Sequence, residues 1–194
     1  MKLLYSLARS LGYELIRRKK NPSLRAHLRN VIHRHAIDVV IDVGANDGQF
    51  ALLLRSEGFR GTIYSFEPVN STYEQLRRIA QHDANWEVFN TALGERVGDA
   101  IINVTASSDL CSLLDPNDFG KTAFPSIAVS HQETIAMDTL DNFIAREKLA
   151  KAARILLKMD TQGYDLQVFQ GAQQSLGCIV CLLSEISLMP IYAQ

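Results

Sequence analysis

An apolar run that breaks into a glycine-containing turn constrains the fold of this chain most strongly. Residues Val39–Val43 carry one polar side chain, Asp42, and lack the alternation of a half-exposed strand. Such a run is typical of a parallel strand that is covered on both faces. The turn Gly44–Gly48 follows, and apolar residues then recur at helical spacing up to Glu57. The sequence therefore predicts a strand, a turn and a helix in succession.

The same pattern repeats along the chain and predicts an α/β fold, with a doubly wound, mostly parallel sheet and crossover helices. Further strands are expected at residues 62–66, 86–91, 101–105, 133–137, 154–159 and 179–184. Helices are expected at residues 71–80, at 138–145 and from about 164 to 174. Residues 107–130 are rich in Ser, Asp, Pro and Gly, and loops of that length are uncommon unless they cover a site.

The size and charge of the chain suggest one main domain preceded by a basic segment. The 194 residues, 47% of them hydrophobic, suffice for one core. Residues 1–34 hold nine Lys or Arg and a single acid. We expect a basic amphipathic helical segment over 1–36 and the main domain over 37–194. The segment suits either an anionic membrane surface or solvent. No stretch approaches the roughly 20 apolar residues of a membrane span, so we expect a cytoplasmic protein, at most peripherally membrane-bound.

The three cysteines are consistent with a reducing compartment. Cys178 and Cys181 have the spacing of a metal-binding pair, but they fall in an apolar run that predicts a strand. Residues three apart on a strand point to opposite faces. We therefore expect two buried structural thiols. No His or third carboxylate is spaced to complete a metal site with Asp160 and Glu185.

Polar residues follow four of the predicted parallel strands. They are the turn Asp42–Gly48, Glu67, Asp160 and Glu185. Open α/β sheets bind ligands beyond the carboxyl ends of their strands, so these residues are expected to converge. Glu67 lies 19 residues beyond Gly48, a spacing at which a carboxylate can accept hydrogen bonds from the ribose hydroxyls of a nucleoside. An exposed turn residue is the alternative for Glu67.

The acids of the first turn indicate the charge of the ligand. A dinucleotide pyrophosphate needs a helix N-terminus free of carboxylates, whereas Asp47 lies inside this turn and Asp42 at its root. The glycines are also spaced GxxxG and lack the middle glycine of GxGxxG. These features favour a cationic ligand such as S-adenosylmethionine over NAD, and disfavour an NAD-dependent oxidoreductase. Nucleic acid is disfavoured because the basic residues lie at one end without interleaved aromatic residues.

Five motifs in order resemble the FkbM family of S-adenosylmethionine-dependent methyltransferases, which act mostly on hydroxyls of sugars and natural products. They are Asp42–Gly48, Tyr64–Pro68, Asn90–Gly94, Thr139–Asp141 and Leu157–Asp165 with Gly171-Ala172. The resemblance covers about residues 38–192. It implies a Rossmann-like class I methyltransferase fold, S-adenosylmethionine as cofactor, and O-methylation of a sugar or glycan hydroxyl, with a lipid-linked acceptor as one expectation from the basic segment.

The resemblance also assigns the cofactor-binding residues. They are Asp42, Gly44, Ala45, Asn46 and Gly48 around the methionine part, Glu67 at the ribose, and Ala92 and Leu93 beside the adenine. A serine-rich stretch is expected near the cofactor or the acceptor, with ordinary loop solvation as the alternative; its members are Ser107, Ser108 and Ser112.

Methyl transfer to a hydroxyl calls for a nearby base, because a sugar hydroxyl is a poor nucleophile at neutral pH. Asp160 is the first candidate, since it follows the strand next to the cofactor strand; capping of the following helix is its alternative role. Lys158, two residues earlier on the same face, would orient Asp160 or the acceptor. His131, at the end of the long loop, is the second candidate base.

Members of that family typically continue beyond the stretch that Pro190–Tyr192 resembles, with another helix and a strand pair. We therefore expect this sheet to lack its last strands. A noncatalytic remnant that binds the cofactor or a partner is accordingly the alternative to an active methyltransferase.

Overall fold

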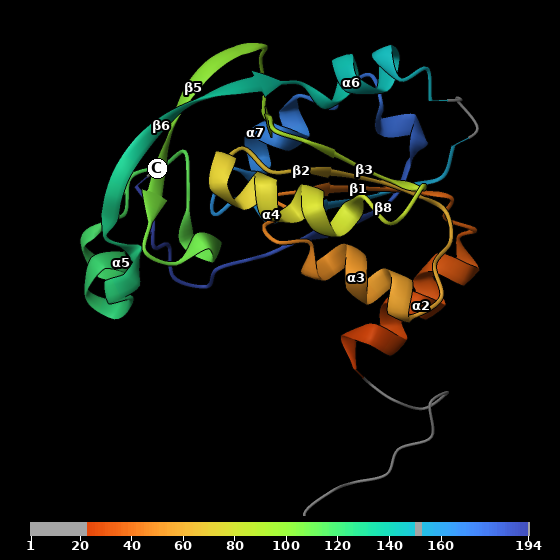
Figure 1. The fold of residues 1–194 in the computed structure, drawn as a ribbon, viewed down its shortest axis with the longest axis horizontal. Helices are drawn as coiled ribbons and strands as arrows, with labels where there is room; N and C mark the ends of the chain where they lie inside the picture. Colours follow the sequence, from red (N-terminus) through yellow and green to blue (C-terminus); the bar gives the residue numbers. More distant parts are fainter. Residues whose placement is uncertain (1–22, 150–152, 194) are drawn as a thin grey trace, which may run out of the picture.

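The computed structural model describes residues 23–149 and 153–193, and its centre is a sheet of five parallel strands in the order β3-β2-β1-β7-β8 (Figure 1). The strands are β1 Val39–Val43, β2 Thr62–Phe66, β3 Trp86–Phe89, β7 Ile155–Met159 and β8 Ile179–Ser184. Strand β1 lies between β2 and β7, so the chain order reverses there. The predicted α/β fold with a doubly wound, Rossmann-like sheet is confirmed.

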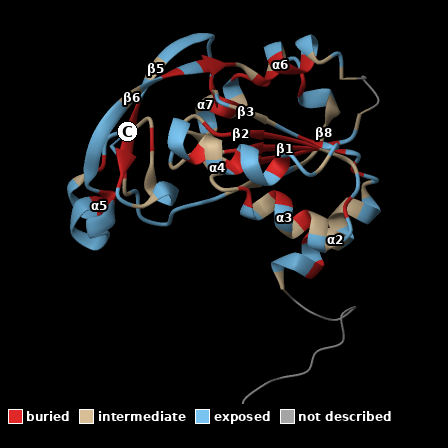
Figure 2. Ribbon diagram, viewed as in Figure 1, coloured by how far each residue is buried: buried red, intermediate tan, exposed pale blue. Residues whose placement is uncertain are grey.

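Helices cover both faces of this sheet (Figure 1). On one face lie α2 Leu24–Arg34, α3 Gln49–Ser56 and α4 Asn70–Ala80, and on the other α6 Leu140–Arg146 and α7 Asp165–Gln170. All five residues of β1 and all five of β7 are buried (Figure 2). Both strands are therefore covered on both faces, and this is why polar and apolar residues do not alternate in them, as predicted.

Alternate residues of the central strands enter two separate cores. Val40, Ile63 and Leu156 pack with Leu54 of α3 and Leu76 of α4. The neighbouring residues of the same strands, Ile41, Tyr64 and Leu157, pack on the opposite face with Phe143 of α6 and Val168 of α7. Because residues of a strand point alternately to its two faces, each central strand contributes to both cores.

The described part of the predicted basic segment belongs to this packed unit. Residues 1–22 lie outside the described residues. Helix α2 buries Leu28 in the core beneath α3 and α4, and its Arg29 pairs with Glu57 just beyond α3. No helix within residues 23–149 and 153–193 has the length and apolar character needed to cross a bilayer.

A second sheet has three strands, β4 Ala92–Leu93, β5 Gly98–Thr105 and β6 Val129–Asp138, in the order β4-β6-β5. Strands β5 and β6 are antiparallel and form a long curved ribbon beside the central sheet (Figure 1). The sequence predicted strands at 101–105 and 133–137, but not this separate sheet. The buried side chains of this sheet form a third core together with Val69. They include Ala92, Ile102, Ile135 and Met137.

The segment predicted as one long loop contains regular structure. Helix α5 spans Asp118–Ala123, and short 3₁₀ turns occupy Ser108–Leu110 and Pro125–Ile127. The side chain of Asn117 caps α5, with its Oδ1 accepting a hydrogen bond from the Gly120 N–H at 2.7 Å. The prediction of a structureless loop was therefore wrong.

Cys178 and Cys181 lie on opposite faces of the sheet, as predicted. Cys178 packs against the core beneath α6 and α7, and Cys181 against the core beneath α3 and α4. Both thiols are only partly buried, contrary to expectation. Cys181 lies on β8, an edge strand of the described sheet, whose residues are covered less completely than those of β1 and β7. Cys178 lies just before it, in a 3₁₀ turn at Leu176–Cys178.

Candidate functional site

A cavity of about 470 Å³ lies at the carboxyl ends of the central strands. Its walls come from the turn after β1, the end of β2, strand β4, residues 108–113 and the segments after β7 and β8. This volume is within the range of small-molecule sites, about 300–1,000 Å³. The polar residues expected to converge there do so, because Asn46, Glu67, Asp160 and Glu185 all line the cavity.

The turn after β1 is built from residues in the left-handed region, with φ of +72° at Gly44, +49° at Asn46 and +88° at Gly48. A Cβ on Gly44 would lie 2.1 Å from the carbonyl oxygen of Asp160, and one on Gly48 would lie 2.8 Å from the Trp86 ring. Both glycines therefore permit close packing of protein against protein. Gly44, Ala45 and Asn46 line the cavity, but Gly48 does not.

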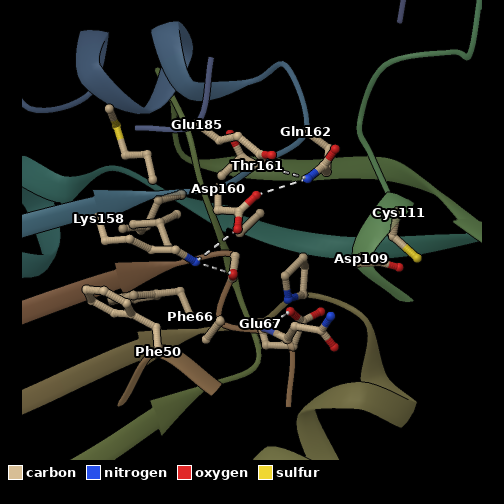
Figure 3. Close-up of a pocket in the computed structure, with 18 of the residues that line it drawn as sticks. Phe50, Phe66, Glu67, Asp109, Cys111, Lys158, Asp160, Thr161, Gln162 and Glu185 are labelled. Carbon is tan, nitrogen blue, oxygen red and sulfur yellow. Dashed lines mark hydrogen bonds and ion pairs between the residues drawn. The ribbon is translucent and has the colours of Figure 1, made fainter. Parts of the chain in front are cut away.

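A buried ion pair joins the root of this turn to β7. Asp42 is fully buried below the cavity and is absent from its lining, and its Oδ1 lies 3.0 Å from Lys158 Nζ. The same ammonium donates a hydrogen bond to the carbonyl of Gly44 at 2.9 Å and lies 3.5 Å from Asp160 Oδ2 (Figure 3). Lys158 thus connects the turn after β1 to Asp160.

Charge governs the protonation of this cluster. Burial alone would lower the pKa of Lys158, but the negative charges of Asp42 and Asp160 and hydrogen bonds to both raise it. Burial raises the pKa of Asp42, and the Lys158 ammonium opposes that rise. Lys158 is accordingly a fixed positive charge and does not act as a proton acceptor.

Glu67 ends β2 with its carboxylate at the cavity wall (Figure 3). Its Oε2 accepts a hydrogen bond from the Asn46 N–H at 2.9 Å, and its Oε1 accepts one from the Val69 N–H at 3.0 Å. The residue is only 6% exposed. Burial raises the pKa of Glu67 to about 7, and the two N–H donors limit the rise. Glu67 is therefore a positioned acceptor and not an exposed turn residue.

The far wall of the cavity is mainly apolar. Ala92 and Leu93 of β4 line it as predicted, together with Phe66 of β2 and Ile102 of β5. From the serine-rich stretch, Ser108 and Ser112 line the cavity but Ser107 does not. Residues 108–113 thus form part of the cover that the sequence predicted for this segment.

Two carboxyl groups face each other at the ends of β7 and β8. Gln162 bridges them, with its Nε2 donating to Asp160 Oδ1 at 2.9 Å and to Glu185 Oε2 at 3.3 Å (Figure 3). Hydrogen bonding with Asp160, then burial, then the negative charge of Asp160 raise the pKa of Glu185. Helix α7 begins at Asp165 with Tyr164 as its N-cap residue, so Asp160 is not a helix cap.

His131 is not brought to this site. It lies on β6 with a largely exposed side chain, whose Nε2 lies 3.1 Å from Glu133 Oε1, and it is absent from the lining of the cavity. Sequence reasoning missed Gln162. The only local signal was its place before Gly163 after a predicted strand. That position indicates a turn, but it does not reveal the contact between Gln162 and Glu185.

Metal ligation has no support within residues 23–149 and 153–193, because no three His, Cys, Asp or Glu side chains there are grouped to hold an ion.

The described geometry agrees with the sequence comparison. The family model for the methyltransferase FkbM domain matches residues 42–192. The matched span includes the turn after β1, Glu67, Asp160 and Glu185, so it contains all four polar positions that converge on the cavity. No curated protein matches the chain.

Proposed function

The chain belongs to the FkbM family of methyltransferases, and from this premise we propose that it transfers the methyl group of S-adenosylmethionine to a hydroxyl of a sugar or glycan. The observation that carries the proposal is Glu67, a buried carboxylate held at the wall of a nucleoside-sized cavity by the turn after β1.

Glu67 is suited to hold the ribose. An ionised carboxylate has about four acceptor positions. Two of them are taken by the N–H groups of Asn46 and Val69, which fix the orientation of the group. The remaining positions can accept hydrogen bonds from two vicinal hydroxyls. Phe66, Ala92 and Leu93 supply the apolar surface that an adenine ring requires beside them.

The charges of the site suit a cationic cofactor end. S-adenosylmethionine supplies, when bound, a methyl group made electrophilic by a positively charged sulfur. Asp160 lies beside the turn that would hold the methionine part, and its carboxylate favours that charge. The Lys158 ammonium would repel the sulfonium only weakly, because it is paired with the buried carboxylate of Asp42. The side-chain amides of Asn46 and Gln49 line the same end and can bind the methionine carboxylate.

Asp160 would act as the base of the reaction. Methyl transfer to a hydroxyl would release the hydroxyl proton, so the site needs a group beside the acceptor that can take it. The hydroxyl proton passes to the Asp160 carboxylate. Lys158, 3.5 Å from Asp160 Oδ2, holds that carboxylate in place. Most of the rate is expected from alignment of the reactants.

Isothermal titration calorimetry tests the proposal. We expect S-adenosylmethionine to bind the intact chain and Glu67→Ala to weaken its affinity about tenfold or more, the cost of losing hydrogen bonds to a charged group. The matched control is Glu95→Ala, an exposed carboxylate outside the cavity lining, which should leave affinity unchanged. NAD should give no heat. Absence of heat with S-adenosylmethionine, or equal affinity of the Glu67→Ala and Glu95→Ala variants, would contradict the proposal.

A further inference from the structure

A second cavity of about 230 Å³ adjoins the first. Three residues, Thr161, Gln162 and Glu185, line both cavities and form the boundary between them. The rest of the second lining comes from Leu114, Gly163 and Asp165 and from two stretches near the C-terminus, 186–187 and 190–192. The boundary is therefore the place where the turns after β7 and β8 meet, beside the candidate base.

Gln162 is the centre of this boundary and is held from four directions. Its Nε2 donates to Asp160 and Glu185, its Oε1 lies 3.4 Å from the Tyr192 hydroxyl, and its carbonyl accepts from Ser112 Oγ at 2.8 Å. Its backbone is left-handed, with φ of +52°. Residues with a Cβ rarely adopt this conformation, and such strained backbones are often found at functional sites.

The lining of the second cavity identifies the chemistry of its ligand. Its polar side chains are two carboxyls, one amide and three hydroxyls, beside aliphatic side chains such as Leu114 and Ile191. The polar residues are Asp165, Glu185, Gln162, Thr161, Ser187 and Tyr192. Among the described residues that line it, none is Lys, Arg or His. Carboxylates and amides bind hydroxyls well, whereas uncompensated carboxylates repel phosphates and acids.

We propose that the second cavity is the acceptor subsite and that it binds an uncharged, polyhydroxylated compound such as a single sugar ring. The inference rests on the proposed function and specifies its acceptor. The volume is below the roughly 300 Å³ at which drug-sized sites begin, which suits one ring better than an oligosaccharide.

The subsite brings the acceptor to the base through Gln162. The Nε2 of Gln162 occupies Asp160 Oδ1 at 2.9 Å. An acceptor hydroxyl that replaces this amide would donate its own proton to Asp160 while its oxygen faces the first cavity. The position that Gln162 Nε2 occupies beside Asp160 thus marks where the acceptor hydroxyl would bind, and Asp160 is the group that takes the proton.

Saturation-transfer NMR on the full chain, in the presence of S-adenosylhomocysteine, tests the subsite. The probes are the methyl glycosides of glucose, mannose, galactose and rhamnose, with glucuronate and mannose phosphate as charged comparisons. We expect signals from at least one neutral glycoside and none from the charged sugars. Ser187→Trp, which fills the cavity from an exposed segment, should reduce the neutral signal at least tenfold; Pro190→Trp fills it from another position and should do the same.

The matched control is Leu188→Trp, because Leu188 is 96% exposed and absent from the lining of both cavities. It should leave the glycoside signal unchanged, and all three variants should bind S-adenosylmethionine within twofold of the parent in calorimetry. The inference is overturned if the parent binds S-adenosylmethionine but no neutral glycoside, if a charged sugar binds better, or if both cavity-filling variants keep the full signal. Failure of the parent to bind S-adenosylmethionine would instead overturn the proposed function.

Discussion

At Gly44 the backbone has no room for a side chain. Gly44 and Gly58 both have left-handed backbones, with φ of +72° and +94°, but only Gly44 has a neighbour in the way of a Cβ, the Asp160 carbonyl at 2.1 Å. Gly58→Ala should cost about 1 kcal/mol from backbone strain alone. Gly44→Ala should lower the free energy of unfolding by clearly more, since the turns after β1 and β7 must separate. Urea denaturation measures both, and equal losses would contradict this packing argument.

The Glu67 carboxyl should make stability depend on pH. Its pKa rises from 4.5 to about 7 on folding, so the folded chain binds this proton more tightly than the unfolded chain. The resulting stabilisation is complete below about pH 4.5 and is lost as the pH rises through 7. Between pH 5 and 8, the free energy of unfolding should fall by up to about 3 kcal/mol more in the parent than in Glu67→Gln.

Urea denaturation of the parent and Glu67→Gln at several pH values between 5 and 8 checks this expectation. Glu95→Gln, at an exposed carboxylate, provides the control and should follow the parent. Parallel stability curves for the parent and Glu67→Gln would show that this carboxyl is not protonated preferentially in the folded state.

At the scale of elements, the contact between β1 and β7 depends on one charge pair, since Asp42 and Lys158 are register partners in adjacent strands. Lys158→Met leaves a carboxylate unpaired in the core and should destabilise the chain by about 3–5 kcal/mol. Adding Asp42→Asn should restore much of that loss. The exposed pair Glu95–Arg96 is the contrast, and Arg96→Met should cost under about 1 kcal/mol. Thermal and urea unfolding of the parent and these three variants would refute the argument if the double variant were no more stable than Lys158→Met.

The same elements show why sequence predicts some of this fold and not the rest. Strands β1, β2 and β7 are apolar runs buried on both faces, a property that a local pattern reveals. Strands β5 and β6 were also recognised as strands, but the pattern does not say which partner a strand takes, so their separate sheet was not predicted. Helix α5, within the segment expected to be a loop, was not predicted either. Its cap, Asn117, can be recognised as a cap only once the helix is known.

The residues of the candidate site could likewise be predicted only in part. Glu67 and Asp160 could be predicted because the ends of parallel strands meet at one edge of a sheet. His131 was misplaced, because its position depends on how far the β5 and β6 ribbon extends. Gln162 was missed because its importance comes from hydrogen bonds to Asp160 and Glu185, and the two carboxyls lie on different strands. Long-range pairing, and not local propensity, decided these outcomes.

For the molecule as a whole, cofactor binding should be visible as added stability. A ligand at one hundred times its Kd raises the free energy of unfolding by about 2.7 kcal/mol. With S-adenosylmethionine we expect that increase, together with slower hydrogen exchange at the amides of Asn46 and Val69, which anchor Glu67. Exchange at the start of β5, an exposed stretch away from the cavity lining, should not change. Uniform protection of all strands without the local effect would argue against this binding site.

The strand order has a consequence for folding during synthesis on the ribosome. Strand β1 emerges early with β2, but its other neighbour, β7, is encoded more than a hundred residues later. At about 5–20 residues per second, that delay is on the order of 5–20 s. During this time one apolar edge of β1 has no native partner, and Asp42 has no Lys158. The nascent chain therefore cannot complete the central sheet, or the cavity wall that includes Asp160, until β7 and the segment after it have been synthesised.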